Sequence, residues 1–176
     1  MKKLLQPAIV TVVPFVLIAC GSMTTSSTPA PEVPAAIAVP AGNKLAMTLK
    51  GVGLLTYECR KNADRFEWAF AGPDAVLRDK SGAQVGKYYG GPTWEHSDGS
   101  KVTGKQLAVS PASAGNIPLQ LVQANPATGS GAFTGVTYIQ RINTQGGVAP
   151  TDPCNATTLG NKKTVNYSAD YVLYKK

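Results

Sequence analysis

Residues 55–60 read Leu-Thr-Tyr-Glu-Cys-Arg and residues 65–70 read Arg-Phe-Glu-Trp-Ala-Phe, so large apolar side chains occupy every second position in both segments. Successive side chains of a β-strand point to opposite faces of a sheet, and this alternation therefore predicts two strands, each with one buried face. A similar alternation returns in residues 136–142 and 165–171, which are rich in the β-branched and tyrosine residues that strands favour. Strand patterns thus extend to the end of the chain.

Segments rich in glycine, proline, aspartate and asparagine separate these patterns, as is typical of turns. No stretch long enough for a helix keeps helical spacing without a glycine or proline. We therefore predict an all-β domain, an antiparallel β-sandwich or barrel of about eight to ten short strands with little helix. The predicted turns include residues 72–74, 79–82, 90–92, 98–100, 114–116 and 145–147.

The N-terminus predicts export. Two lysines follow Met1, an apolar run extends from residue 4 to residue 19, and the run ends in Leu-Ile-Ala before Cys20. This is the layout of a secretory signal peptide, which we assign to residues 1–19. The run is shorter than the roughly 20 apolar residues of a spanning helix and contains two prolines, which disfavours a transmembrane anchor.

The sequence around Cys20 resembles the bacterial lipobox, in which the cysteine is acylated and becomes the new N-terminus. The alternative is an ordinary signal peptide that contains a cysteine. Resemblance to lipoproteins implies a palmitate-type lipid anchor in the membrane, and Gly21 and Ser22 in place of aspartate favour the outer membrane of a Gram-negative cell envelope over the inner one. Residues 20–42, rich in serine, threonine, proline and alanine, then predict a flexible tether, and residues 43–176 a single domain.

The charge of the chain does not point to nucleic acid. Removal of the two lysines of the signal peptide lowers the formal net charge of +7 by two, to +5. The remaining lysines and arginines are scattered along the sequence, whereas nucleic-acid-binding proteins usually have a dense basic stripe. We therefore expect no nucleic-acid partner.

Once Cys20 is assigned to the lipid, Cys59 and Cys154 remain. Outside the cytoplasm, two cysteines most simply form a disulfide. The alternative is a pair of free thiols, but the sequence contains no Cys-x-x-Cys motif.

A set of short motifs is spread over the predicted domain. The motifs are Tyr-Glu-Cys (57–59), Trp-Ala-Phe (68–70), Pro-Asp-Ala-Val-Leu (73–77) with Asp79 and Gly82, Gly-Gly-Pro-Thr-Trp-Glu (90–95), Asp-Gly-Ser-Lys-Val (98–102), Ile-Pro (117–118), Ile-Gln-Arg (139–141), Thr-Gln-Gly-Gly-Val-Ala-Pro (144–150), Cys154 and Tyr-Ser-Ala-Asp-Tyr (167–171). Together they resemble the domain of unknown function 3455 family, over nearly all of residues 52–174. That resemblance implies an extracytoplasmic setting and paired cysteines but no established activity, although some fungal relatives carry a malate dehydrogenase label. One departure is Tyr88, where the family pattern has histidine.

The dehydrogenase label has no support in the residues. The glycines at 129, 131 and 135 lead into a predicted strand at 136–142, whereas a dinucleotide-binding fingerprint must open a helix. We therefore predict no nucleotide and no other cofactor.

The segment of residues 88–96 is a candidate ligand site, because aromatic side chains beside a Gly-Pro turn can present flat faces to a sugar or another apolar ligand. The alternative is that Trp94 and one tyrosine pack in the core, while His96 and the acids belong to turns. Catalytic residues remain unknown and no metal site is predicted, because a single histidine supplies too few ligands. A noncatalytic domain that binds a glycan or another envelope partner, or has a structural role, is our first hypothesis, and an enzyme acting on envelope or extracellular polysaccharide is the alternative. The candidate ligand-binding residues are Tyr88, Tyr89, Trp94, Glu95, His96 and Asp98.

Overall fold

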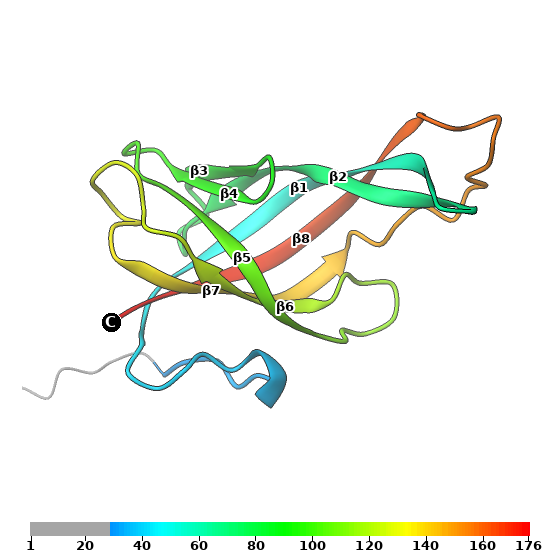
Figure 1. Ribbon diagram of the computed structural model, residues 1–176. Coiled ribbons are helices and arrows are strands. Elements are labelled where there is room, and N and C mark those ends of the chain that lie inside the picture. The colour runs from blue at the N-terminus through cyan, green and yellow to red at the C-terminus, as the bar shows by residue number, and fades with distance from the viewer. Residues whose placement is uncertain (1–28) are drawn as a thin grey trace, which may run out of the picture.

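In the computed structural model, which describes residues 29–176, eight antiparallel strands form one closed barrel (Figure 1). Each strand pairs with the next along the chain, and the last strand closes the barrel on the first. This arrangement confirms the predicted all-β class and selects the barrel over the sandwich. The strands are β1 (Lys44–Asn62), β2 (Arg65–Arg78), β3 (Gln84–Tyr89), β4 (Thr93–His96), β5 (Lys101–Ser110), β6 (Leu119–Ala124), β7 (Val136–Gly146) and β8 (Lys162–Lys175).

The strands are less uniform than predicted. Strand β1 has 19 residues and β2 and β8 have 14 each, whereas β4 has only four. The turn predicted at residues 72–74 is wrong, since these residues lie inside β2. The ladder between β2 and β3 begins only at Asp74, so within the described part of the chain the edge of β2 at Pro73 is free. A free edge is where a strand tolerates a residue without an amide hydrogen.

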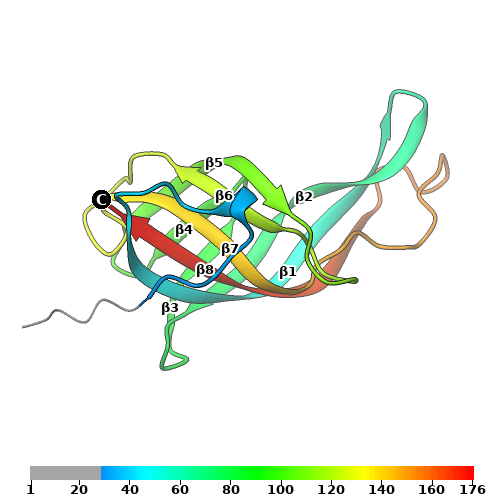
Figure 2. The same ribbon diagram turned by 90° about the horizontal axis from the view of Figure 1, so that it is seen from below.

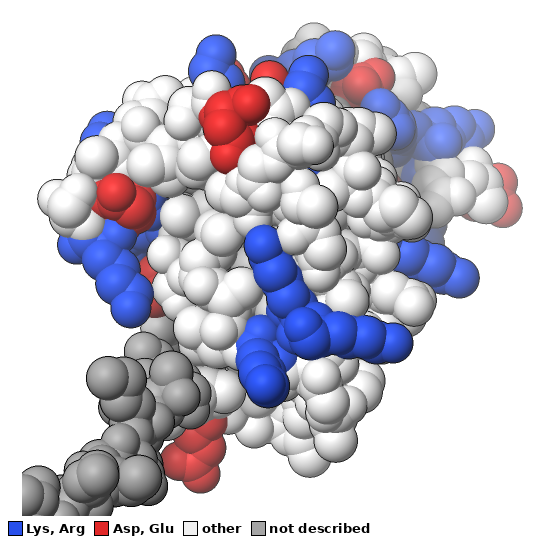
Figure 3. All heavy atoms as spheres, turned by 90° about the vertical axis from the view of Figure 1, so that its left-hand side faces the viewer, with Lys and Arg blue, Asp and Glu red and all other residues white. Residues whose placement is uncertain are grey.

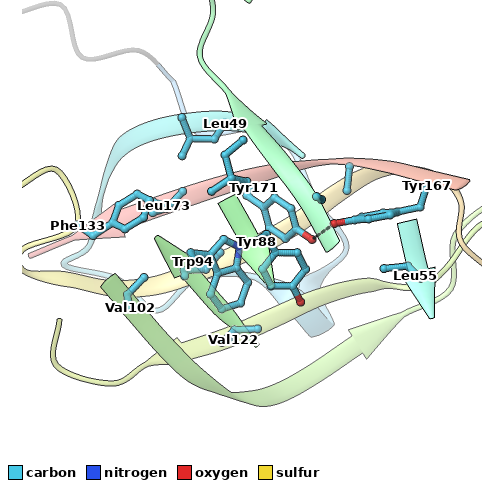
Figure 4. Packing of buried hydrophobic residues seen from close by; sticks show 14 of the residues in the cluster. Leu49, Leu55, Tyr88, Trp94, Val102, Val122, Phe133, Tyr167, Tyr171 and Leu173 are labelled. Carbon is cyan, nitrogen blue, oxygen red and sulfur yellow. Dashed lines mark hydrogen bonds between the residues drawn. The ribbon is translucent and has the colours of Figure 1, made fainter. Parts of the chain in front are cut away.

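Aromatic rings fill the middle of the barrel (Figure 4). Tyr88 stacks on Trp94 with ring centroids 4.7 Å apart, and Tyr171 packs against both, at 5.0 and 5.6 Å. Gly51 on β1 provides the room, because a Cβ atom at this position would lie only 2.5 Å from the ring of Tyr171. Close packing of this kind contributes both area burial and favourable ring geometry.

One end of the barrel is closed by the loop between β6 and β7, which lies at the left in Figure 1. Phe133 from this loop is fully buried in the same core cluster as Leu173 and Val102. The amide of Phe133 donates a hydrogen bond to the hydroxyl of Ser100, at 3.1 Å, in the turn between β4 and β5. Two loops that are far apart in the sequence therefore seal this end together.

At the other end, the β1–β2 hairpin extends beyond the barrel, to the right in Figure 1. A disulfide joins Cys59 on this hairpin to Cys154 in the loop before β8, with Cα atoms 5.5 Å apart. The indole nitrogen of Trp68 also donates to the carbonyl of Asp152 in that loop, at 2.8 Å. The predicted disulfide is confirmed, and it fastens the overhanging hairpin to the loop beside it.

The second half of the predicted tether is not free. Residues 35–37 form a 3-10 helix, and Ile37 is completely buried against the outer wall of the barrel, next to Leu121 and Val172. Gln140 donates from Nε2 to the Ile37 carbonyl at 2.7 Å, and Figure 2 shows this segment lying over β6 and β7. The prediction of flexibility failed here because a few apolar residues among the prolines find a matching apolar patch. We call residues 33–39 the strap.

The signal peptide and Cys20 lie outside the described residues. Across residues 29–176, no helix has the length and apolar character needed to span a membrane. On the face shown in Figure 3, basic side chains form one small group and are otherwise scattered among acidic and uncharged residues. The expectation that no nucleic acid binds stays a prediction.

Candidate functional site

The six predicted site residues fall on the β3–β4 hairpin and the turn after it, where the pairing of Tyr88 with Trp94 sets the register. Both of these side chains point into the barrel and are buried, at 4% and 0% exposure. The structure thus agrees with the alternative interpretation, in which Trp94 and one tyrosine belong to the core. Trp94 presents no face to a sugar at the surface.

Tyr89 and Glu95 lie on the outer side of the same hairpin. The hydroxyl of Tyr89 donates to Oε2 of Glu95 at 2.5 Å, and Nζ of Lys101 lies 3.3 Å from Oε1. The hydrogen bond from Tyr89, followed by the contacts with Lys101, holds the pKa of Glu95 below its ordinary value. Glu95 is therefore ionised at neutral pH, which suits an ion pair and not a general acid.

Asp98 organises the closed end of the barrel. Its Oδ1 accepts hydrogen bonds from the amide and hydroxyl of Ser100, at 2.9 and 2.6 Å, and its Oδ2 accepts one from the amide of Ala132 at 2.7 Å. These bonds, led by the Ser100 hydroxyl, hold the pKa of Asp98 far below its usual range. Nδ1 of His96 lies 2.9 Å from Oδ2, and the imidazole packs edge-on against Phe133. Each of these groups has a clear structural role in joining two loops.

The predicted residues therefore do not converge on one cleft. They divide between the core, an external ion pair and a loop junction. Among residues 29–176, no three His, Cys, Asp or Glu side chains gather as a metal site would need.

A pocket with a volume of about 350 Å³ opens at the end of the barrel opposite Phe133. The opening arises because the β3–β4 hairpin is short. Pairing of β3 with β2 stops at Asp74–Tyr89, and pairing of β4 with β5 stops at Thr93–Thr103, while β2 and β5 continue past the turn at Pro92. The pocket is lined by Leu55, Tyr57, Phe70, Tyr88, Pro92, Gly104, Gln106, Ile117, Pro118, Gln120, Val122 and Arg141.

Most of the polar groups in this pocket are already held in place. The hydroxyl of Tyr57 donates to the Gly147 carbonyl at 2.7 Å, and Nε2 of Gln120 donates to Oε1 of Gln106 at 2.5 Å. Burial raises the pKa of Tyr57 and of Tyr88. For both tyrosines the positive charge of Arg141 opposes this rise in pKa.

Arg141 is the one charged side chain among the pocket residues. It lies on β7 directly opposite Tyr171 and Gln120, which also face the interior. Its Nε and Nη2 donate to the Pro118 carbonyl at 3.2 and 2.9 Å. The sequence indicates that Arg141 faces the interior, since residues 139 and 141 share one face of a predicted strand and Ile139 is apolar. An arginine at such a position does not by itself indicate a binding site.

Of the six predicted residues, only Tyr88 lines the pocket. Figure 4 shows its ring between Trp94 in the middle of the barrel and Leu55 near the open end. The segment predicted from sequence thus contributes the turn that ends the hairpin and one wall of the cavity.

A family model described as "Protein of unknown function (DUF3455)" matches residues 40–175, which is most of the chain and all eight strands. No curated protein and no solved structure matches the chain. With the strands, the paired cysteines and the family motifs inside the matched region, the chain belongs to the DUF3455 family of proteins of unknown function.

Proposed function

We propose that this protein is an envelope lipoprotein, anchored through a lipid on Cys20, whose barrel binds a small molecule in the pocket at its open end without transforming it. The observation that carries the proposal is the pocket of about 350 Å³. Cavities of small-molecule sites usually measure about 300–1,000 Å³ and combine apolar walls with a few placed polar groups. This pocket meets both criteria with Leu55, Ile117 and Val122 as walls and Arg141 as a polar group.

The two ends of the barrel support this function in different ways. The closed end is held by hydrogen bonds that Asp98 accepts and by the buried ring of Phe133. The carboxylate of Asp98 is thus engaged in joining the two loops. The open end has apolar surface that faces a cavity. A guest that enters there would meet the stacked core of Tyr88 and Trp94 at the base.

The enzyme alternative gains no support from this geometry. Glu95 is engaged with Tyr89 and Lys101, and Asp98 accepts hydrogen bonds from loop amides. A pair of acids working across a sugar needs one carboxyl group with a raised pKa, whereas both of these pKa values are lowered.

The proposed location rests on the N-terminal sequence and agrees with the disulfide, because such bonds persist outside the cytoplasm. Its test is mass spectrometry of the mature protein from membranes. We expect an acylated N-terminal Cys20, and a Cys20→Ser variant that remains unprocessed and without lipid. An unacylated mature protein in the soluble fraction would refute the anchor.

Binding is tested with neutral indole, which is small enough for the pocket. In amide-resolved NMR titrations we expect saturable shifts centred on residues 117–122 and on Tyr88. A Gln120→Trp variant places a large ring in the cavity and should abolish them. Gln123→Trp is the matched control on the same strand, because Gln123 is exposed and outside this pocket. Shifts that persist in Gln120→Trp, or none in the wild type, would count against the pocket as a binding site.

A further inference from the structure

The charge in the pocket is unbalanced. No aspartate or glutamate lines the cavity, and among the ion pairs within residues 29–176 Arg141 takes part in none. Its hydrogen bonds go to the neutral carbonyl of Pro118. A partly buried guanidinium without a counterion favours the arrival of an anion, because a charge-assisted hydrogen bond is roughly twice as strong as a neutral one.

The guanidinium is also oriented before any guest arrives. Two of its nitrogens are fixed by one carbonyl oxygen, and within the part of the chain that the structure describes Nη1 makes no hydrogen bond. Arginine presents its donors in a planar fork that matches the two oxygens of a carboxylate. The site therefore offers direction as well as charge.

The remaining walls define the body of the guest. Leu55, Ile117 and Val122 are buried and apolar, and the ring of Phe70 stands half exposed at the rim, edge-on to Tyr57. The pocket volume of about 350 Å³ suits a ring or a short acyl chain. One positive charge matches one negative charge.

We propose that the pocket binds a small organic monocarboxylate, with its carboxylate on Arg141 and its apolar body between Leu55, Ile117 and Tyr88. This inference rests on the proposed function and adds the chemical class of the ligand. It makes Arg141 the residue that distinguishes an acid from a neutral molecule of the same shape.

The test compares indole-3-acetate with indole-3-acetamide, which has the same ring and a neutral amide in place of the carboxylate. Titration calorimetry on the oxidised wild-type domain should give about tenfold or greater preference for the acid, as expected when a hydrogen bond to a charged group replaces a neutral one. Raising the salt concentration should weaken the binding of indole-3-acetate more than that of indole-3-acetamide. The wild-type comparison requires no variant and so does not depend on how a variant folds.

Arg141→Met keeps an unbranched apolar side chain and removes the charge. We expect the ratio of the affinities for indole-3-acetate and indole-3-acetamide to fall to about one, with the affinity for indole-3-acetamide unchanged. The backbone amide signal of Tyr88 should shift in NMR titrations with either compound. Arg78→Met is the matched control, because Arg78 is an exposed arginine that also donates to a backbone carbonyl, that of Gly82. Equal affinity for acid and amide in the wild type would overturn the inference and leave the proposed function standing. Failure of indole and both derivatives to bind would refute the proposed function itself.

Discussion

The Cys59–Cys154 disulfide closes a stretch of the chain with a sequence separation of 95 residues. A cross-link of this span removes conformational freedom mainly from the unfolded state, and the chain-entropy relation gives about 4 to 5 kcal/mol for a loop of this length. A domain of this size has a free energy of unfolding of only about 5–15 kcal/mol. Removal of the bridge is therefore expected to take away about a quarter or more of the free energy of unfolding.

The perturbation is the double variant Cys59→Ser/Cys154→Ser, compared with the oxidised wild type by equilibrium urea unfolding at neutral pH. We expect the free energy of unfolding to fall by about 3–5 kcal/mol, and the slope with urea to rise because the unfolded chain becomes more expanded. Indole binding should persist under native conditions, since neither cysteine lines the pocket.

The result that would refute this reasoning is a loss below about 1 kcal/mol with an unchanged slope, since the entropic account requires an effect on the unfolded state. Native contacts that do not involve the sulfur atoms would explain such a small loss of stability. Trp68 bonds to Asp152, and the backbone of Cys59 bonds to Asn161 and Gly160 without help from the sulfurs. Hydrogen exchange in residues 57–70 would then show whether these bonds alone hold the hairpin in place.

Two further outcomes are expected. The pKa of Asp98 is lowered in the folded state, so its contribution to stability is complete above the ordinary carboxyl pKa of about 4 and is lost as the pH falls toward the lower folded value. Asp98→Asn should therefore lower the melting temperature at pH 7. It should also reduce the decrease in melting temperature between about pH 4 and pH 2. Parallel plots of melting temperature against pH for the variant and the wild type would contradict the assigned role. Ile37→Ala removes a fully buried side chain from the strap and should lower the free energy of unfolding in urea by about 2–5 kcal/mol, whereas Ala36→Ser at an exposed neighbour should change little. Equal stability of these two variants would mean that the strap does not unfold together with the barrel.

The strands and the disulfide could be predicted from sequence because both depend on local signals. Alternation at residues 55–60 and 65–70 identifies strands without knowledge of their partners, and setting aside Cys20 leaves one pair of cysteines. Closure into a barrel depends on the pairing of β1 with β8, between residues more than one hundred positions apart, and no local pattern specifies this contact. The prediction of a turn at residues 72–74 was wrong for the same reason. A strand can contain Pro73 here because the pairing of β2 with β3 begins only at Asp74, and this depends on contacts distant in sequence.

The candidate site was predicted only in part. Aromatic residues around a Gly-Pro turn indicate either a surface for a ligand or a packed core, and burial of Tyr88 and Trp94 decides for the core. The pocket instead depends on the short length of β3 and β4 relative to their neighbours, which leaves an opening. Arg141 was missed because an arginine in a predicted strand does not by itself indicate a binding site, and the strap was missed because its apolar residues are sparse among prolines.

The opening has a consequence for how the protein behaves among other chains. Beyond the end of the β3–β4 hairpin, β2 and β5 each present an edge with no neighbouring strand among residues 29–176. An unpaired edge can recruit a strand from another molecule. Both edges are irregular there: β2 carries Pro73 and a bulge between Gly72 and Phe70, and β5 carries a bulge at Leu107. A proline and two bulges make a poor template for an added strand. The open end of the barrel thus discourages the intermolecular pairing that leads to aggregation.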